Sequence, residues 1–226
     1  MGNGEILKVT IPKFATPEKF DIKHTHASVI LGAYPLAAKF ESAIEMGCGN
    51  GVSSVIMALL NSDLLKMIAV DVDKQACENA LTFVKLNNLS KRISVLNADV
   101  LEVPKIVGYE SVDFVFFNPP FHVVGKVSED KRRFLERNED VFERFVLSTF
   151  KVLKNKGYFR MITSPVNTLN NFDVLRKHNL TPKTLVPIYG KKGVDSKLIL
   201  IEGLKNGKER GFKVKAPVFL DEMILA

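Results

Sequence analysis

One stretch limits the folds open to this chain more than any other, an apolar run that ends in two prolines. The run Val112–Phe117 has the composition of a strand buried on both faces of a parallel sheet. Pro119 and Pro120 cannot donate a hydrogen bond to a neighbouring strand, so the strand must stop before them. Asn118 therefore lies just beyond the carboxyl end of a strand, where open α/β sheets bind their ligands.

The residues Asn118-Pro119-Pro120-Phe121 suit the recognition of a planar amine. The side-chain oxygen of Asn118 can accept one N–H of the amine, and the carbonyl of Pro119 can accept the second. Two acceptors draw the nitrogen lone pair out of conjugation, so the amine becomes nucleophilic towards an electrophilic methyl group without a strongly basic residue. Phe121 can stack on the ring that carries the amine. A rigid Pro-Pro turn after a core strand is the structural alternative, and these residues alone do not decide between the two.

A glycine-rich turn earlier in the chain has the context of a nucleotide-binding loop. Gly47, Gly49 and Gly51 lie between a predicted strand, Ser42–Met46, and a predicted apolar helix, Val52–Leu60. Glycines let the backbone approach a ligand closely, and the start of the helix directs free N–H groups towards it. The order strand, glycine turn and helix is the one that such a loop requires.

Two aspartates follow predicted strands at positions where an acid can contact a nucleoside. Asp71 follows the apolar stretch Leu65–Val70, about 20 residues past the glycine turn, where an acid can bind both ribose hydroxyls. Asp99 follows the predicted strand Ile93–Asn97 and can accept a hydrogen bond from an adenine amino group, or can serve only as a loop or cap residue. For Asp73 we prefer the N-cap of the next helix, Lys74–Asn88.

The remaining pattern predicts further elements on both sides of these motifs. A helix is expected to follow Tyr34 and run through Phe40, and a charged loop or short helix is expected over 123–138. Later elements are a helix over 139–154 closed by Gly157, a strand over 158–163, a helix over 170–179, and strands over 184–188 and 196–204 that could pair antiparallel.

Composition bounds the class of protein. A chain of 226 residues is most simply one domain, divided into an arm and helix (1–40), a cofactor-binding core (41–204) and a tail (205–226). Two cysteines, no apolar run long enough to span a bilayer and no signal-peptide pattern lead us to expect a cytoplasmic protein. The net charge of +7 makes a polyanionic partner plausible, and nothing near His24 and His26 completes a metal site. The oligomeric state stays open, with a monomer as the simplest expectation.

Taken together, these motifs resemble the Rossmann-like methyltransferases that use S-adenosylmethionine, over roughly residues 40–204. The resemblance implies an α/β fold with a seven-stranded, mostly parallel sheet, an antiparallel C-terminal hairpin and helices on both faces. It also implies that the cofactor-binding residues are Glu45, Gly47, Gly49 and Gly51 around the methionine part, Asp71 at the ribose, Asp99 at the adenine, and Asn118. The catalytic loop implied in the same way is Asn118, Pro119, Pro120 and Phe121.

A closer resemblance is to the bacterial tRNA methyltransferases that modify adenine N6 beside a valine anticodon. Three stretches carry it: Ser28–Tyr34, which is similar to that family's Leu-Leu-Gly-Ala-aromatic; Gly125–Ser128 with the basic segment after it; and Leu200–Lys208 with Val214–Phe219. The chain departs from the family at His24-Thr25-His26-Ala27, where Gly-Thr-Asp is usual, so that aspartate's cofactor contact is not carried over. It also has His122 where a second aromatic residue is more frequent.

The resemblance implies transfer of a methyl group from S-adenosylmethionine to adenine N6 in a structured RNA, most simply a tRNA. Phosphate contacts are expected from basic residues after the catalytic loop and in a late turn, namely Lys126, Lys131, Arg132, Arg133, Lys191 and Lys192. Two alternatives stay open, which are N5-methylation of a glutamine in a protein such as a release factor, and a cofactor- or RNA-binding module without catalysis.

Overall fold

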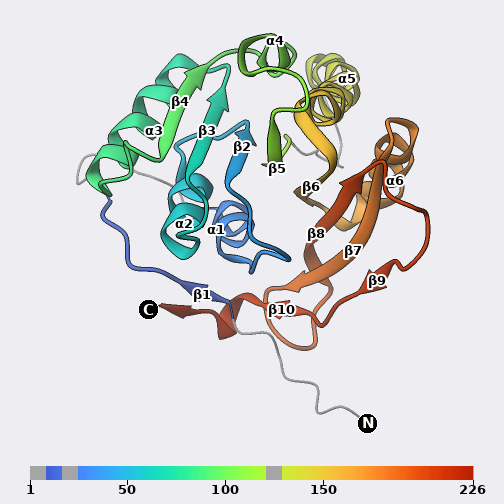
Figure 1. Cartoon of the computed structure of the whole chain (residues 1–226). Coiled ribbons are helices and arrows are strands. Elements are labelled where there is room, and N and C mark those ends of the chain that lie inside the picture. Colours follow the sequence, from blue (N-terminus) through green and yellow to red (C-terminus); the bar gives the residue numbers. More distant parts are fainter. Residues whose placement is uncertain (1–8, 17–24, 121–128, 226) are drawn as a thin grey trace.

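A long mixed sheet forms the centre of the fold in the computed structural model. The structure describes residues 9–16, 25–120 and 129–225, with the side chains of 129–140 left out. The strand order across the sheet is β10-β7-β8-β6-β5-β2-β3-β4, and β9 pairs with the outer side of β7 (Figure 1). A separate two-stranded sheet joins β1 (Thr10–Ile11) to β11 (Ile224–Leu225).

Among the described residues the main sheet has nine strands, two more than predicted, because the two-residue strands β9 and β10 extend a body of seven longer strands. All neighbouring pairs from β4 to β6 are parallel, and β8 lies antiparallel between β6 and β7. Their bounds are β2 Ser42–Met46, β3 Lys66–Asp71, β4 Ile93–Asn97, β5 Val112–Phe117, β6 Leu153–Thr163, β7 Leu180–Tyr189 and β8 Ser196–Lys205. The α/β fold class and the antiparallel C-terminal hairpin are confirmed.

Helices cover both faces of this sheet. One apolar core lies under α1 to α3, and the other lies under α4 to α6. Their bounds are α1 His26–Ala33, α2 Val52–Leu60, α3 Lys74–Leu86, α4 Val103–Val107, α5 Glu129–Val152 and α6 Thr168–Lys177. Within the described residues, no helix has the combined length and apolarity that would let it cross a membrane.

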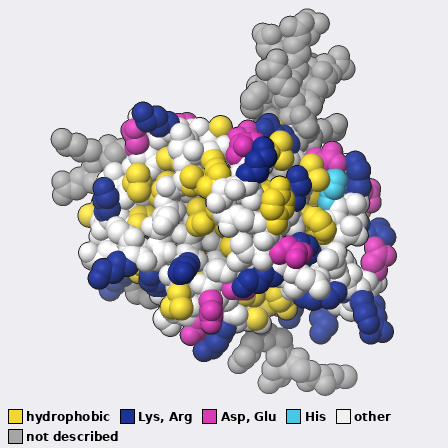
Figure 2. Space-filling model, turned by 45° about the horizontal axis from the view of Figure 1, so that its top comes forward, with side chains coloured by type: hydrophobic (Ala, Val, Ile, Leu, Met, Phe, Trp, Pro, Cys, Tyr) yellow, Lys and Arg dark blue, Asp and Glu magenta, His cyan; other side chains and the backbone are white. Residues whose placement is uncertain are grey.

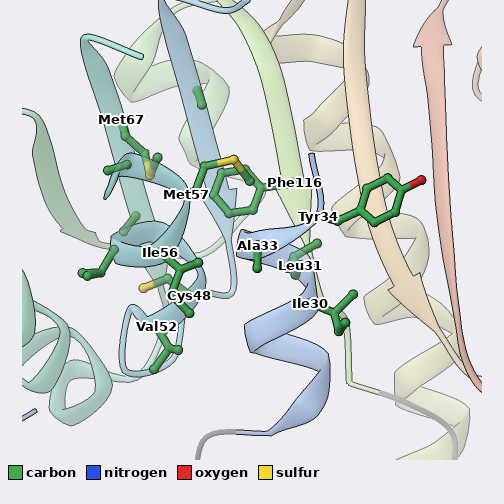
Figure 3. Close-up of a cluster of buried hydrophobic side chains, with 14 of the residues drawn as sticks. Ile30, Leu31, Ala33, Tyr34, Cys48, Val52, Ile56, Met57, Met67 and Phe116 are labelled. Carbon is green, nitrogen blue, oxygen red and sulfur yellow. The ribbon is translucent and has the colours of Figure 1, made fainter. Parts of the chain in front are cut away.

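The strand at the centre of the sheet divides its side chains between the two cores. Phe114 and Phe116 point into the core under α1 to α3, whereas Val115 and Phe117 point into the opposite one. This is the period of two that a strand imposes, and it explains why Val112–Phe117 is apolar almost throughout. Figure 3 shows Phe116 beside Met57 of α2 in the first core.

The prediction of a helix that follows Tyr34 and runs through Phe40 is wrong, because the helix in this region, α1, begins at His26 and ends at Ala33. Tyr34 already has an extended backbone, with φ −63° and ψ 130°, and Pro35 follows it. A proline disfavours the helical conformation of the residue before it, so the helix stops there.

The predicted end of the helix over 139–154 is also wrong. Helix α5 begins earlier, at Glu129, and ends at Val152, while Gly157 lies inside β6. The residue with a left-handed backbone in this segment is Lys156, inside β6, with φ +63°. Gly157 is needed for a different reason, since a Cβ there would lie 3.2 Å from the carbonyl oxygen of Asp113 and 2.9 Å from that of Lys154.

The shortest helices and strands are the elements that the sequence pattern does not predict. Helix α4 has five residues, and the tail contains β9 (Lys213–Val214), β10 (Val218–Phe219) and β11, each of two residues. Two-residue strands have no periodicity to read, so only pairing with β7 or β1 defines them. Through β11 the C-terminal residues lie against the N-terminal strand β1 (Figure 1).

The antiparallel part of the sheet depends on a glycine, which gives a stability prediction. A Cβ on Gly203 of β8 would lie 2.2 Å from the carbonyl oxygen of Thr181 and 2.5 Å from the ring of Phe159. We expect Gly203→Ala to lower the free energy of unfolding by about 3 kcal/mol, because neither backbone nor ring can move aside cheaply. Gly190→Ala is the matched control, since nothing lies within 4 Å of its Cβ position. Equal urea midpoints for the two variants would contradict the packing argument.

Candidate active site

The glycine turn between β2 and α2 has a backbone that other residues adopt only with strain. Gly47, Gly49 and Gly51 all have positive φ, at +70°, +52° and +77°. A Cβ on Gly51 would lie 3.1 Å from that of Ala80, whereas the space beside Gly49 is open to 4 Å. The turn therefore brings bare backbone against helix α3 on one side and leaves room for a ligand on the other.

Two adjoining cavities lie along this turn. The first, about 390 Å³, is lined by Gly47, Asp71, Val72, Asp99, Val100, Asn118, Pro120, Val141, Arg144 and Phe145. The second, about 240 Å³, is lined by Thr25, Ser28, Glu45, Gly47, Cys48, Gly49, Asn50, Val52, Ser53 and Asn118. Gly47 and Asn118 border both. Residues from β2, β3, β4 and β5 thus meet at the carboxyl ends of their strands, as expected for this fold.

Asn118 is held where the two cavities meet. It directly follows β5, and its Oδ1 atom is buried without a hydrogen-bond partner among the described residues. A buried acceptor left unpaired costs about 1–3 kcal/mol, so this atom is suited to receive an N–H from a ligand. Pro120 lines the first cavity and Pro119 is buried beside it, while Phe121 lies outside the described residues.

Asp71 ties the glycine turn to the end of β3. Its Oδ2 accepts from the backbone N–H of Gly49 at 2.8 Å, and its Oδ1 accepts from that of Asp73 at 2.9 Å. Each carboxylate oxygen keeps a second acceptor position, so Asp71 can also accept from hydroxyls in the first cavity. The prediction for Asp73 is confirmed, because its side chain caps α3 at Gln75 and Ala76.

Asp99 lies in the first cavity with a partner that sequence reasoning missed. The guanidinium of Arg144 on α5 pairs with its Oδ2 at 2.5 Å, and the backbone N–H of Leu101 donates to its Oδ1 at 2.9 Å. Arg144 and its neighbour Phe145 both border the cavity. The two paired residues are 45 positions apart, and no local pattern links them.

Glu45 is a buried acid at the second cavity. Only 1% of it is exposed, and burial raises the pKa of its carboxyl to about 7, against the opposing hydrogen bonds from Ser54 and Ser53. Ser54 Oγ donates to its Oε2 at 2.5 Å. A cation in the second cavity would favour the ionised form, so the site is electrostatically matched to an ammonium group.

The start of α1 forms another wall of the second cavity. Thr25 is the N-cap, its Oγ1 accepts from the backbone N–H of Ser28 at 3.2 Å, and the two hydroxyls lie 2.9 Å apart. This is the stretch that departs from the resembled family, and no site prediction included it. Its hydroxyls can serve as donors to a ligand carboxylate.

Comparisons with known proteins agree with this arrangement. A family model described as "Methyltransferase small domain" matches residues 26–181, which is more than half of the chain. The chain belongs to the methyltransferase small domain family. Helix α1, the glycine turn, Asp71, Asp99 and Asn118 all lie inside the matched range.

Individual methyltransferases are similar at low identity. A tRNA1(Val) (adenine(37)-N6)-methyltransferase from Aliivibrio salmonicida is 25% identical over 175 residues, covering 76% of this chain and 73% of that protein. A ribosomal RNA small subunit methyltransferase C from Buchnera aphidicola is 26% identical over 125 residues, but these cover 55% of this chain and only 33% of that protein. The crystal structure of a predicted O-methyltransferase from Agrobacterium tumefaciens superposes with a TM-score of 0.69 at 18% identity, covering 86% and 87% of the two chains.

As a member of this family the protein is a methyltransferase, and its two cavities offer groups that suit the predicted cofactor, S-adenosylmethionine. The first cavity offers the acids Asp71 and Asp99 to a nucleoside, and the second offers Glu45 and the Thr25 hydroxyl to an amino acid. Individual contacts between these residues and the cofactor stay predictions. Among the described residues, no group of three His, Cys, Asp or Glu side chains could hold a metal ion.

The raised pKa of Glu45 predicts a specific pH dependence of stability. Between the ordinary carboxyl pKa of 4.5 and about 7, the folded protein binds more protons than the unfolded chain. Its free energy of unfolding therefore falls as the pH rises across this window, by on the order of 3 kcal/mol from this group. Glu45→Gln removes the effect, so we expect the stability of this variant relative to the wild type to increase from pH 5 to pH 8.

Urea unfolding of the cofactor-free protein at several pH values tests this expectation. Glu78→Gln on the exposed side of α3 is the control, and its stability relative to the wild type should change little over the same range. A pH-independent difference for Glu45→Gln would contradict the raised pKa.

Proposed function

We propose that this methyltransferase transfers a methyl group from S-adenosylmethionine to the exocyclic N6 amine of an adenine in RNA, within a tRNA near the anticodon. The observation that carries the proposal is the buried Oδ1 of Asn118 at the junction of the two cavities, which has no hydrogen-bond partner in the part of the chain that the structure describes. It is an acceptor placed after β5, at the edge where ligands of this fold bind.

In this proposal the protein acts by holding the amine rather than by deprotonating it. Asn118 Oδ1 accepts one N–H, the Pro119 carbonyl accepts the other, and Pro120 keeps the backbone rigid beside the first cavity. Bound S-adenosylmethionine supplies an electrophilic methyl group on its sulfonium. Holding both N–H groups would draw the nitrogen lone pair out of conjugation with the ring. As the N–C bond forms, the methyl–sulfur bond would break with its electron pair left on sulfur, which gives S-adenosylhomocysteine, and the surplus proton would leave to water.

The nature of the relatives and the charge of the chain favour RNA as the acceptor. Relatives with 22–25% identity over most of their length are named as tRNA1(Val) (adenine(37)-N6)-methyltransferases. The net charge of +7 suits a polyanion. An adenine in a loop is unstacked more cheaply than one in a duplex, and stacking on Phe121 would add about 1–3 kcal/mol. Phe121, Lys126 and the side chains of Lys131, Arg132 and Arg133 lie outside the described residues.

The role assigned to Asn118 gives the central prediction. Asn118→Ala should lower the rate of methyl transfer by about 10²-fold or more, since it removes one acceptor that holds the reacting amine. The variant should still bind S-adenosylhomocysteine, because the glycine turn, Asp71 and Glu45 are unchanged. A tritiated-methyl assay run beside isothermal titration separates the two effects.

The control for this experiment is Asn170→Ala, which removes an exposed amide on α6. It should keep both transfer and cofactor binding. Undiminished turnover by Asn118→Ala would refute the mechanism. Loss of cofactor binding would instead assign Asn118 to the cofactor site.

The acceptor itself is identified by incubating the protein with labelled S-adenosylmethionine and separate pools of tRNA, rRNA, DNA and protein, followed by nucleoside and peptide mass spectrometry. We expect N6-methyladenosine in the tRNA pool. Label on a different base, or N5-methylglutamine in the protein pool, would replace the proposed substrate while leaving the methyltransferase assignment in place.

A further inference from the structure

A third cavity lies far from the glycine turn, at the outer part of the sheet. It has a volume of about 230 Å³ and is formed by α6, the start of β7 and the segment 206–212. Its lining includes Phe172, Arg176, Thr181, Glu209, Arg210 and Phe212. We propose that this cavity binds an unpaired nucleotide of the RNA substrate, a second contact distant from the methylated base. This inference rests on the proposed function and deepens it.

The segment that closes this cavity is fixed to the sheet by side chains. Thr181 Oγ1 donates to the carbonyl of Gly207 at 3.0 Å, and Lys183 Nζ donates to that of Arg210 at 2.7 Å. Arg176 Nε donates to Glu209 Oε1 at 2.8 Å, which ties the segment to α6 as well. Strand β9 follows directly and pairs with β7. The cavity is therefore preformed, so a ligand would not have to order a loop on binding.

The chemistry of the lining matches a nucleobase with its phosphate. The rings of Phe172 and Phe212 meet edge to face, with centroids 5.6 Å apart and planes at 80°. Phe212 is 45% exposed and can offer its ring to a base. Arg210 is exposed and makes no ion pair with any described residue, so its guanidinium is free to contact a phosphate or stack on a base. Aromatic rings beside arginines are the usual elements of single-strand RNA recognition.

The surface around the cavity is basic. Lys and Arg outnumber Asp and Glu on the segments that border it. The basic residues are Arg176, Lys177, Lys183, Lys208, Arg210, Lys213 and Lys215, and the acidic ones are Asp173 and Glu209. Glu143 of α5 pairs with Lys177. Figure 2 shows Lys and Arg side chains, with Asp and Glu side chains among them, along the right-hand edge of the molecule, on the side of α6 and β9 in Figure 1. A polyanion is the partner that such a surface attracts.

The position of the cavity defines which part of the RNA it can reach. Phe117 is paired across the sheet through Met161 and Ile201 to Leu185, and Thr181 lies four residues before Leu185 on β7. Three strand spacings of about 4.8 Å and four residues of about 3.3 Å each place the cavity roughly 20 Å from the end of β5. A nucleotide bound there is therefore a different nucleotide from the one that carries the reacting adenine.

Binding of fluorescein-labelled, unfractionated tRNA to the 226-residue chain, measured by fluorescence anisotropy at several salt concentrations, tests the inference. Phe212→Ala should weaken binding about tenfold, and Phe212→Leu, which keeps most of the packing on Phe172, should weaken it similarly. Arg210→Gln should lower the slope of log K against log salt by about 1. In the transfer assay, these variants should raise the KM for tRNA and leave kcat unchanged.

Matched controls are Tyr109→Ala and Lys91→Gln, which remove an exposed ring and an exposed cation elsewhere and should change neither binding nor its salt dependence. Variants at Phe212 and Arg210 that bind tRNA like the wild type would overturn the inference while leaving the proposed function intact. Weaker binding by these variants, without N6-methyladenosine formation by the wild type, would support the cavity and refute the proposed reaction. A wild-type protein that binds no tRNA, or binds only an acidic peptide, would refute both.

Discussion

The arrangement of the site depends on one buried cation, Arg160 of β6. Its side chain is fully buried and donates to Glu202 Oε1 on β8 from Nε at 2.9 Å and from Nη2 at 2.7 Å. The same guanidinium donates to the carbonyls of Tyr34 and Pro35, both at 2.7 Å, at the end of α1. Loss of either charged partner would leave the other buried and unpaired, at a cost of about 3–5 kcal/mol. One ion pair thus joins the antiparallel part of the sheet to α1.

The position of α1 connects this ion pair to the second cavity, the predicted cofactor site. Gly32 allows close contact between α1 and α2, since a Cβ there would lie 2.5 Å from the carbonyl oxygen of Ser53. Ser54, the next residue, holds Glu45 by its hydroxyl, and the opposite end of α1 places Thr25 in the second cavity. Figure 3 shows the apolar core around this contact, to which α1 contributes Leu31 and Ala33 and α2 contributes Ile56 and Met57. Residues as distant in sequence as Glu202 and Glu45 therefore help to fix the same wall of the second cavity.

The sequence predicts those parts of the fold that local patterns determine. Val52–Leu60 and Ile93–Asn97 have the predicted bounds because apolar periodicity and a glycine turn define them within a few residues. Gly157 was misassigned because a glycine required by strand packing looks, in sequence, like one that ends a helix. The site residues on strand ends could be predicted, since strand order alone brings them to one edge. Arg144 could not be, because its contact with Asp99 exists only once α5 is packed on the sheet.

The distribution of unsatisfied polar atoms separates structural from functional groups in this molecule. Three buried side-chain atoms lack a partner among the described residues, and two of them, Asn118 Oδ1 and Arg144 Nε, belong to residues that line the first cavity. By contrast, Arg160 is more deeply buried and fully paired. Among the described residues, the fold pairs this buried cation fully yet leaves an acceptor and a donor unpaired on two residues that line one cavity, a local cost that a ligand can offset. Such local conflicts are expected at functional sites, so the unpaired atoms support the proposal that substrate and cofactor bind at this cavity.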